Sequence, residues 1–302
     1  MKIPLRGLRY TVGRIAIDAV QLMLSRTPLR VNRLFCDVAF FSLYPLITLL
    51  PTYRKTVIRN LRIALGNELG DREIRRVARR AMRNIFRMPG DILYYGFPKN
   101  HAQLARDVTI RGAEHIEDAL GRGKGVIGLG AHMICFLLLT VRLANSGIPF
   151  VVPTKDPRNS MLRDKLRGWR HRSGVRFIDV DSADKGKNEI TATLDRNELV
   201  YLIADERKKR DGLSVPFFGR EALTAVGPAV LSLRTGAPIV PIFIARKESG
   251  FVVDIFPPID DGIPEQGKEA VYDLTLSANK AIEDYVRQYP EQWVWTHQRW
   301  RL

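Results

Sequence analysis

The sequence predicts an α/β fold with a mixed, largely parallel sheet flanked by helices, preceded by a helical region. Strand-like and helix-like segments alternate through residues 101–302, as they do in α/β proteins. Residues 1–100 have helical periodicity instead and are strongly basic. Apolar residues make up 45% of the 302 residues and charged residues 26%, which favours a packed core over global disorder. We therefore expect a helical region over 1–100 and an α/β domain over 101–302.

Positive charge is concentrated at the front of the chain. The net charge is +16, and residues 1–100 carry 19 lysines and arginines against 6 aspartates and glutamates. This asymmetry is typical of a segment that meets a polyanion, either an anionic membrane surface or a nucleic acid. Aromatic residues are not interleaved with the arginines and the sequence has no nucleic-acid motif, so we expect no nucleic-acid partner.

The two cysteines and the N-terminus give no sign of export. Cys36 and Cys135 lie in apolar runs and have neither the number for a disulfide framework nor the spacing of a metal site, which fits a reducing compartment. The N-terminus is basic but lacks a small-residue cleavage pattern, so we expect no cleaved signal peptide.

The helical region begins with an amphipathic and then an apolar segment. Residues 1–26 mix cationic and apolar residues at helical spacing, which predicts an amphipathic helix at a membrane surface. Leu34–Tyr53 is more apolar and about as long as the roughly 20 residues that cross a bilayer. Because Asp37 and Pro45 interrupt it, we expect it to be embedded in or lie along one leaflet. The alternative is a buried helical hairpin of a soluble protein.

The second half of this region is rich in arginine. Arg54–Leu65 is a basic amphipathic stretch, and a further helix is expected from Gly70-Asp71 to about Met88. That helix carries seven arginines against two acidic residues, so its like charges repel one another unless an external anion lies nearby. The pattern favours a surface for the phosphate head groups of an anionic membrane, and the alternative is a solvated face.

The α/β domain is expected to place its polar site at one edge of the sheet. Clefts in such sheets open at the carboxyl ends of strands, and His132 and Asp205 each follow a predicted strand. The expected strands are 108–111, 126–129, 149–152, 175–180, 199–204, 239–245 and 251–256, and the expected helices are 133–144, 160–171, 187–196, 226–233 and 269–288.

His132 is the first candidate for chemistry. It lies at a strand-to-helix junction within KGVIGLGAHMICFLL (residues 124–138), where a neutral imidazole can take a proton from a hydroxyl group. The alternative is a histidine that fills space and bonds to a backbone carbonyl. The chain has no Walker loop, no dinucleotide-binding glycine spacing, no structural-zinc spacing and no G-x-S-x-G motif.

Several short segments resemble, in order and spacing, the bacterial lipid A late acyltransferases within the wider lysophospholipid acyltransferase superfamily. The similarity covers most of the chain, and the closing PEQWVWTHQRW is specific to that family. The segments are 123–132, 155–157, 203–206, 215–220, 224–228, 234–238 and 290–300.

The resemblance implies a glycerolipid acyltransferase-like fold and an acyltransferase of lipid A-type biosynthesis. Such a protein lies on the cytoplasmic face of the inner membrane, monotopic or held by a single N-terminal anchor. It transfers a fatty acyl chain from acyl carrier protein, or a related thioester, to a hydroxyl group of a membrane lipid, and it needs no metal or organic cofactor. In the family a histidine followed five positions later by a carboxylate forms the catalytic dyad, with the histidine as general base.

This sequence departs from the family pattern at two positions. Position 137, where the carboxylate is expected, is Leu137, which cannot accept a hydrogen bond from the imidazole. Val152 stands where the family has an arginine before Pro153, so a cationic substrate contact is missing too. Asp205 and Glu206 are candidates to replace the acid from a neighbouring strand end, because triads are defined by geometry and not by spacing. Asp91 is the third candidate.

Two hypotheses follow, alongside a nucleic-acid binder supported by charge alone. The first is an active acyltransferase with a displaced or absent acid. The second is a catalytically impaired homologue that serves as a lipid-binding or scaffolding subunit of a membrane complex. His297 is expected to pack the C-terminus. The predicted site comprises His132 and Asp205 as catalytic residues and Arg220, Lys155, Glu206 and Thr224 as substrate contacts, without a metal.

Overall fold

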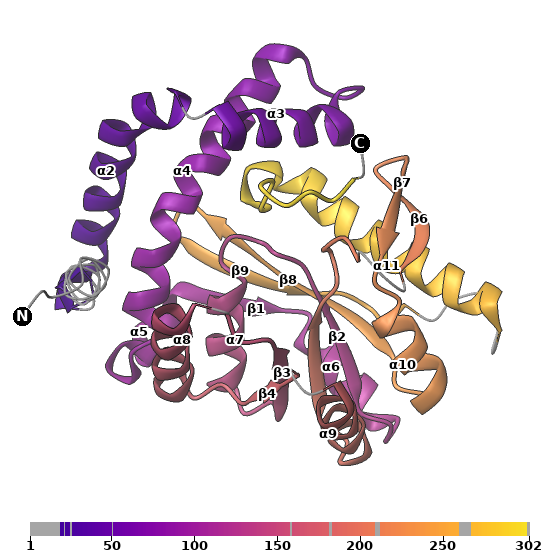
Figure 1. The fold of residues 1–302 in the computed structure, drawn as a ribbon. Helices are drawn as coiled ribbons and strands as arrows, with labels where there is room; N and C mark the ends of the chain where they lie inside the picture. Colours follow the sequence, from indigo (N-terminus) through magenta and orange to yellow (C-terminus); the bar gives the residue numbers. More distant parts are fainter. Residues whose placement is uncertain are drawn as a thin grey trace, which may run out of the picture.

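The computed structural model describes residues 19–20, 22–24, 26–49, 51–157, 159–180, 183–208, 212–259 and 267–300. Its centre is a seven-stranded sheet in the order β1-β9-β8-β2-β5-β3-β4 (Figure 1). Every strand pair is parallel except β8 with β9. The predicted α/β fold with a mixed, largely parallel sheet is therefore confirmed. The strands are β1 (Val108–Arg111), β2 (Val126–Gly130), β3 (Phe150–Thr154), β4 (Phe177–Asp179), β5 (Leu199–Ile203), β8 (Ile239–Lys247) and β9 (Gly250–Ile255).

The central strands are apolar along their whole length because helices cover the sheet. All five residues of β2 are buried, and so are the first seven of β8. Two glycines of β2 make room for a ring from the neighbouring strand. A Cβ atom on Gly130 would lie 2.3 Å from the Tyr201 hydroxyl oxygen, and one on Gly128 would lie 3.0 Å from the Tyr201 ring. The strand thus keeps β5 close along its length.

Two further strands form a separate antiparallel hairpin, β6 (Leu213–Phe217) and β7 (Arg220–Thr224). These two strands were not expected from the sequence. Pro216 has no N–H for a sheet ladder, so the segment lacks the signature of a central strand. The turn uses Phe218 and Gly219, both with positive φ (52° and 68°), which matches the twist of a tight hairpin.

Helices flank the sheet, as predicted (Figure 1). The expected helix at 133–144 begins only at Phe136, because the Ile134 N–H bonds to the Gln292 carbonyl and holds the preceding residues in a loop. The short helices α5 and α6, of seven and nine residues, were not predicted. The helices are α4 (Asp71–Tyr95), α5 (His101–Asp107), α6 (Ala113–Gly121), α7 (Phe136–Ala144), α8 (Ser160–Ser173), α9 (Ala183–Asp195), α10 (Gly227–Thr235) and α11 (Lys268–Gln288).

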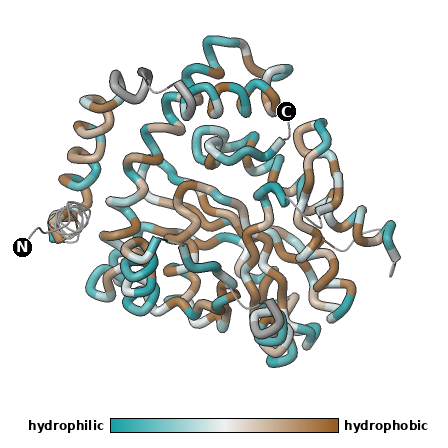
Figure 2. Tube along the Cα trace, viewed as in Figure 1, coloured by the Kyte–Doolittle hydropathy of each residue, from teal (hydrophilic) through white to brown (hydrophobic). Residues whose placement is uncertain are grey.

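Two helices precede α4, namely α2 (Leu29–Leu49) and α3 (Pro51–Leu65). Helix α2 lies beside α4 (Figure 1), where Asp37 pairs with Arg83 at 2.7 Å and also with Arg87. Figure 2 colours much of α2 brown, whereas teal and brown alternate along α3. Among the described helices, none has the length and hydropathy needed to cross a bilayer. Most of the predicted amphipathic segment 1–26 lies outside the described residues.

The C-terminal segment 290–300 ties distant parts of the fold together. It begins with the short 3₁₀ helix Pro290–Gln292 and then runs beside the loop that follows β2, where Met133 and Trp293 form a β-bridge. The Asn60 amide of α3 donates to the carbonyls of Trp295 and His297. The Trp300 indole donates to Phe217 in the hairpin. This segment therefore closes the carboxyl edge of the sheet.

Candidate active site

The register of two neighbouring strands brings His132 and Asp205 together. Strands β2 and β5 are parallel, and their last paired residues are Gly130 and Ile203. His132 and Asp205 each lie two residues beyond that pair, so both side chains leave the sheet at the same carboxyl edge. The His132 Nδ1 atom lies 2.7 Å from the Asp205 Oδ1 atom, a hydrogen-bond distance.

Asp205 is buried and is held by three hydrogen bonds. Besides the imidazole, the His132 backbone N–H donates to Oδ2 at 2.8 Å, and the Trp293 indole donates to the same oxygen at 2.6 Å. Only 1% of the Asp205 side chain is exposed to solvent. Such a carboxylate cannot rotate away from the imidazole without leaving buried donors unpaired, which costs about 1–3 kcal/mol for each donor.

The two groups shift each other's pKa. Burial alone would raise the pKa of Asp205, but the charge of His132 and the bonds from its ring, its backbone N–H and Trp293 hold that pKa below its usual value. Burial alone would lower the pKa of His132, but Asp205 and, more weakly, Glu206 raise it. Since the carboxylate only accepts, Nδ1 carries the proton and Nε2 presents a lone pair in the neutral imidazole.

The His132 side chain is 22% exposed to solvent, and a second acid and a second histidine lie close to its ring. The Glu206 Oε1 atom lies 3.6 Å from His132 Nε2 and 3.5 Å from His297 Nδ1. The two imidazole rings lie 5.0 Å apart between centroids, and Phe136 packs edge-on against the His132 ring. Burial and the charge of His132 lower the pKa of His297.

The C-terminal segment fixes the backbone of the loop that carries His132. The Val294 N–H donates to the His132 carbonyl at 3.1 Å. Together with the bond from the His132 N–H to Asp205, this leaves the residue anchored on both sides. The contact of Trp293 with Asp205 was not expected from the sequence, and His297 was expected only to pack the C-terminus. The one available signal was the position of both residues in the PEQWVWTHQRW motif.

The structure distinguishes between the three acids considered as replacements at position 137. Asp205 and Glu206 both approach His132. Asp91 does not, because it is buried between α4 and the sheet, where it pairs with Arg246 and, at 3.3 Å, with Arg33.

Leu137 lines an apolar pocket of about 540 Å³. This volume lies within the range of about 300–1,000 Å³ that is typical of small-molecule sites. Leu137 directly follows Phe136 in the chain, and the Phe136 ring packs edge-on against that of His132. Its walls come from the segment before α2 and from α4, α7 and α8. They are formed by Val20, Leu24, Met88, Pro89, Ile92, Leu93, Leu137, Leu162, Lys165, Leu166 and Trp169.

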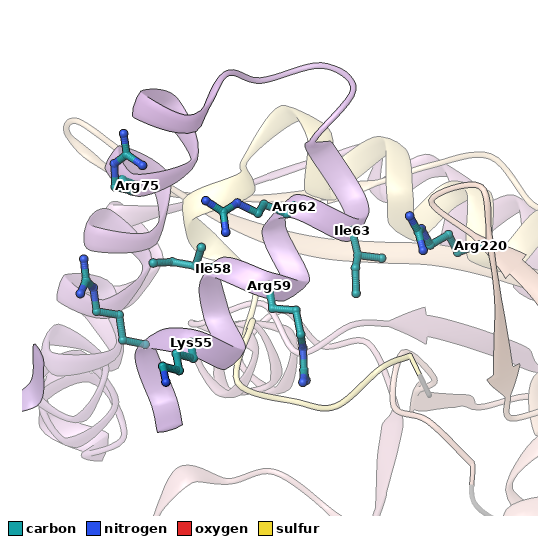
Figure 3. A pocket seen from close by; sticks show the side chains of 8 residues that line it. Lys55, Ile58, Arg59, Arg62, Ile63, Arg75 and Arg220 are labelled. Atoms are coloured by element: carbon teal, nitrogen blue, oxygen red, sulfur yellow. The ribbon is translucent and has the colours of Figure 1, made fainter. Parts of the chain in front are cut away.

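Arg220 lies in a different, strongly cationic pocket of about 490 Å³ (Figure 3), which we call the basic pocket. Arg62 and Arg75 share the carboxylate of Asp71. For the other cations of this pocket, the described residues supply no acidic partner. The basic pocket is lined by Arg54, Lys55, Ile58, Arg59, Arg62, Ile63, Arg75 and Arg220.

The other predicted substrate contacts lie in contrasting surroundings. Lys155 follows β3 at the carboxyl edge of the sheet and is exposed. Thr224 is buried, and its hydroxyl accepts from Arg299 at 2.7 Å and donates to the Ala222 carbonyl. Val152 is buried within β3. The substrate roles of Lys155, Thr224, Glu206 and Arg220 stay predictions.

These features define an α/β protein whose polar site lies at the carboxyl ends of parallel strands, where such folds place their ligand sites. The model of the bacterial lipid A biosynthesis acyltransferase family matches residues 6–302. The chain therefore belongs to the bacterial lipid A biosynthesis acyltransferase family, and the resemblance seen in the sequence is confirmed.

Sequence identity to individual members of this and related families is low. The chain is 28% identical over 212 residues to the lipid A biosynthesis lauroyltransferase of Escherichia coli (strain K12), covering 66% of this chain and 63% of that protein. It is 29% identical over 201 residues to the palmitoleoyltransferase of the same strain, covering 64% and 61%. It is 26% identical over 184 residues to the phosphatidylinositol mannoside acyltransferase of Mycobacterium tuberculosis (strain CDC 1551 / Oshkosh), covering 60% and 56%. The matched part thus spans less than two-thirds of each relative.

Proposed function

We propose that this protein is an active acyltransferase that moves a fatty acyl chain from acyl carrier protein, or a related thioester, to a hydroxyl group of a membrane lipid. The acceptor class is a glycolipid of the lipid A or phosphatidylinositol mannoside type. The observation that carries the proposal is the bond between Asp205 and His132 Nδ1, because it supplies the orienting acid that position 137 lacks.

The reaction needs a base and then an acid at one place. His132 Nε2 accepts the proton of the acceptor hydroxyl while that oxygen attacks the thioester carbonyl. The carbon–sulfur bond breaks, and the imidazolium returns the proton to the leaving thiolate. Asp205 holds the ring in the required tautomer and stabilises its positive charge, as the carboxylate of a serine-protease triad does.

The apolar pocket suits the acyl chain of the donor, and the basic pocket suits the head group of the acceptor. The apolar pocket has the lining for a fatty acyl chain, and one lining residue, Leu137, is the chain neighbour of Phe136, whose ring packs against that of His132. The basic pocket presents Arg220 and five further cations to an anionic head group (Figure 3). Arginine forks bind phosphate through paired hydrogen bonds, so we assign the acceptor's phosphate to this pocket.

The region 1–100 brings the α/β domain 101–302 to the cytoplasmic face of the inner membrane. The outer side of α2 leaves Val31, Leu34 and Val38 exposed by 50%, 64% and 56%. These positions fall on one helical face, which suits a helix that lies in the plane of the interface. Arginines on α3 and α4 add attraction to anionic lipids of about 1 kcal/mol for each charge near the surface.

An acylation assay tests the catalytic proposal. The full-length protein, in detergent or vesicles, receives an acyl carrier protein thioester and a phosphorylated glycolipid acceptor, and the ester product is measured. We expect His132→Ala to lower turnover by about 10²–10⁴-fold. The control His171→Ala removes an exposed imidazole from α8 and leaves turnover unchanged. Absence of transfer by the wild-type protein with every acceptor of this class would favour the scaffolding alternative.

Vesicle flotation tests the membrane proposal. We expect the double variant Leu34→Ser, Val38→Ser to release the protein from anionic vesicles, because burial of each such side chain contributes about 1.5–3 kcal/mol. Val230→Ser is the matched control, since Val230 is 45% exposed but lies on α10. Equal flotation of all three proteins would contradict the assignment to α2.

A further inference from the structure

Three side chains from distant parts of the chain converge on the open side of His132. They are His132 after β2, Glu206 after β5 and His297 in the C-terminal segment, and one ligand atom of each lies within 4.8 Å of the other two. Their exposed side-chain fractions are 22%, 55% and 37%, so a small ion can reach them from solvent.

Two of the three separations between ligand atoms, those to Glu206, suit a shared ion better than hydrogen bonds. Glu206 Oε1 lies 3.6 Å from His132 Nε2 and 3.5 Å from His297 Nδ1. Both separations are longer than the 2.7–3.2 Å or so of an N–H···O hydrogen bond. A tetrahedral ion with bonds of about 2.0–2.1 Å to nitrogen and oxygen holds its ligand atoms about 3.3 Å apart, which is close to these values.

The surroundings of His132 are those of a metal-ligating histidine. Such a histidine usually donates its other ring N–H to a carboxylate, which fixes the tautomer and makes the ligating nitrogen more basic. Here Nδ1 donates to Asp205 at 2.7 Å, so Nε2 presents its lone pair on the side of Glu206 and His297. Two histidines, one glutamate and an open fourth position are a zinc ligand set known from hydrolases.

We propose that His132, Glu206 and His297 bind a divalent transition-metal ion such as Zn²⁺, and that the bound ion blocks acyl transfer. The ion occupies the Nε2 lone pair, which is the pair that accepts the proton of the acceptor hydroxyl. The binding half of this proposal is independent of the enzyme's activity, whereas the inhibitory half rests on the proposed function. The sequence offered no such site because its three ligands share no recognisable spacing.

A binding measurement tests the site directly. Metal-free full-length protein is titrated with Co²⁺, whose visible absorption reports four-coordinate binding, and Zn²⁺ is then used to displace it. We expect one ion per chain in the wild-type protein and at least tenfold weaker binding in Glu206→Gln and His297→Ala. Asp205→Asn should weaken binding by about 10–100-fold, the usual effect of losing an outer-shell carboxylate.

The controls separate loss of a ligand from loss of the fold. His171→Ala removes a histidine outside the cluster and should bind Co²⁺ as the wild type does. Glu206 is exposed and its replacement by glutamine keeps the shape, so its thermal unfolding without metal should match that of the wild type. A wild-type protein that binds no stoichiometric ion, or a Glu206→Gln variant that binds one equally well, would overturn the site.

The acylation assay tests the inhibitory half. We expect Zn²⁺ to suppress transfer by the wild-type protein at the concentrations that displace Co²⁺, and a chelator to restore it. Unchanged or faster transfer with Zn²⁺ bound would overturn inhibition. If no acyl transfer is found under any condition but the three residues bind Co²⁺, the metal site stands and the proposed function falls.

Discussion

The His132–Asp205 pair and the basic pocket are both polar sites, but they are built in opposite ways. Asp205 as a whole residue is 2% exposed to solvent. Its carboxylate receives three hydrogen bonds, two of them from groups of His132 and one from Trp293. Arg54, Lys55 and Arg220 are exposed, and the described acids form no ion pair with them. The first site is complete before a substrate arrives, whereas the second holds charge that an incoming anion can neutralise. Strand register thus fixes the geometry of the first site, whereas the second is formed by exposed side chains.

Among the variants that test this difference between the two sites, Asp205→Asn should lower turnover the most. Asparagine keeps the shape but presents either a donor or a weaker acceptor to Nδ1, so the ring loses its fixed tautomer and the partner of its positive charge. Turnover should fall by about 10²–10⁴-fold in the acylation assay, the upper figure being that of the equivalent change in a serine protease.

Two controls accompany this variant. Trp293→Phe removes one of the three bonds to Asp205 and leaves the imidazole bond in place, so its turnover should lie between those of the wild type and Asp205→Asn. Asp118→Asn changes an exposed acid on α6 and should have no effect. Wild-type turnover in Asp205→Asn would show that the orienting acid lies elsewhere.

Much of the fold could be predicted, because its strands are short apolar runs between turns. All seven strands expected from the sequence are present in the sheet. The hairpin of β6 and β7 could not be predicted. Pro216 argues against a strand, and the turn at Phe218 interrupts the alternation of apolar and polar residues by which strands are identified.

The candidate site was predictable only in part. His132 and Asp205 stood out because each follows a strand, but choosing Asp205 over Asp91 depends on β2 and β5 being neighbours, which one sequence does not reveal. The approach of Trp293 and His297 depends on how the C-terminal segment crosses the loop after β2. No local pattern encodes such a long-range contact.

Leu137→Glu should have the next largest effect, and it tests the expectation from the sequence that the site lacks a carboxylate at position 137. Since Asp205 already bonds to Nδ1, a second carboxylate is not needed, and at position 137 it would enter an apolar pocket. Burying an unpaired acid is unfavourable, and the charge would also oppose a hydrocarbon chain. We expect at least tenfold slower transfer of long acyl chains.

Leu137→Met is the matched control because it keeps the pocket apolar at nearly the same volume, and its transfer rate should stay within about twofold of the wild type. Comparing thioesters of different chain length identifies the origin of any loss. A Leu137→Glu protein that transfers faster than the wild type would mean that the site lacks its acid despite the contact with Asp205.

Arg220→Gln should have the smallest effect, because the basic pocket contains five other cations. We expect the KM for a phosphorylated acceptor to rise about fivefold, equivalent to about 1 kcal/mol for one charge beside an anionic surface, with kcat unchanged. Arg220→Lys keeps the charge but loses the paired donors, so its KM should lie between the two. The difference should shrink as salt is added, since exposed charges are screened. Arg111→Gln, an exposed arginine at the end of β1, is the control; an equal rise in KM there would mean that overall charge, and not this pocket, draws the acceptor.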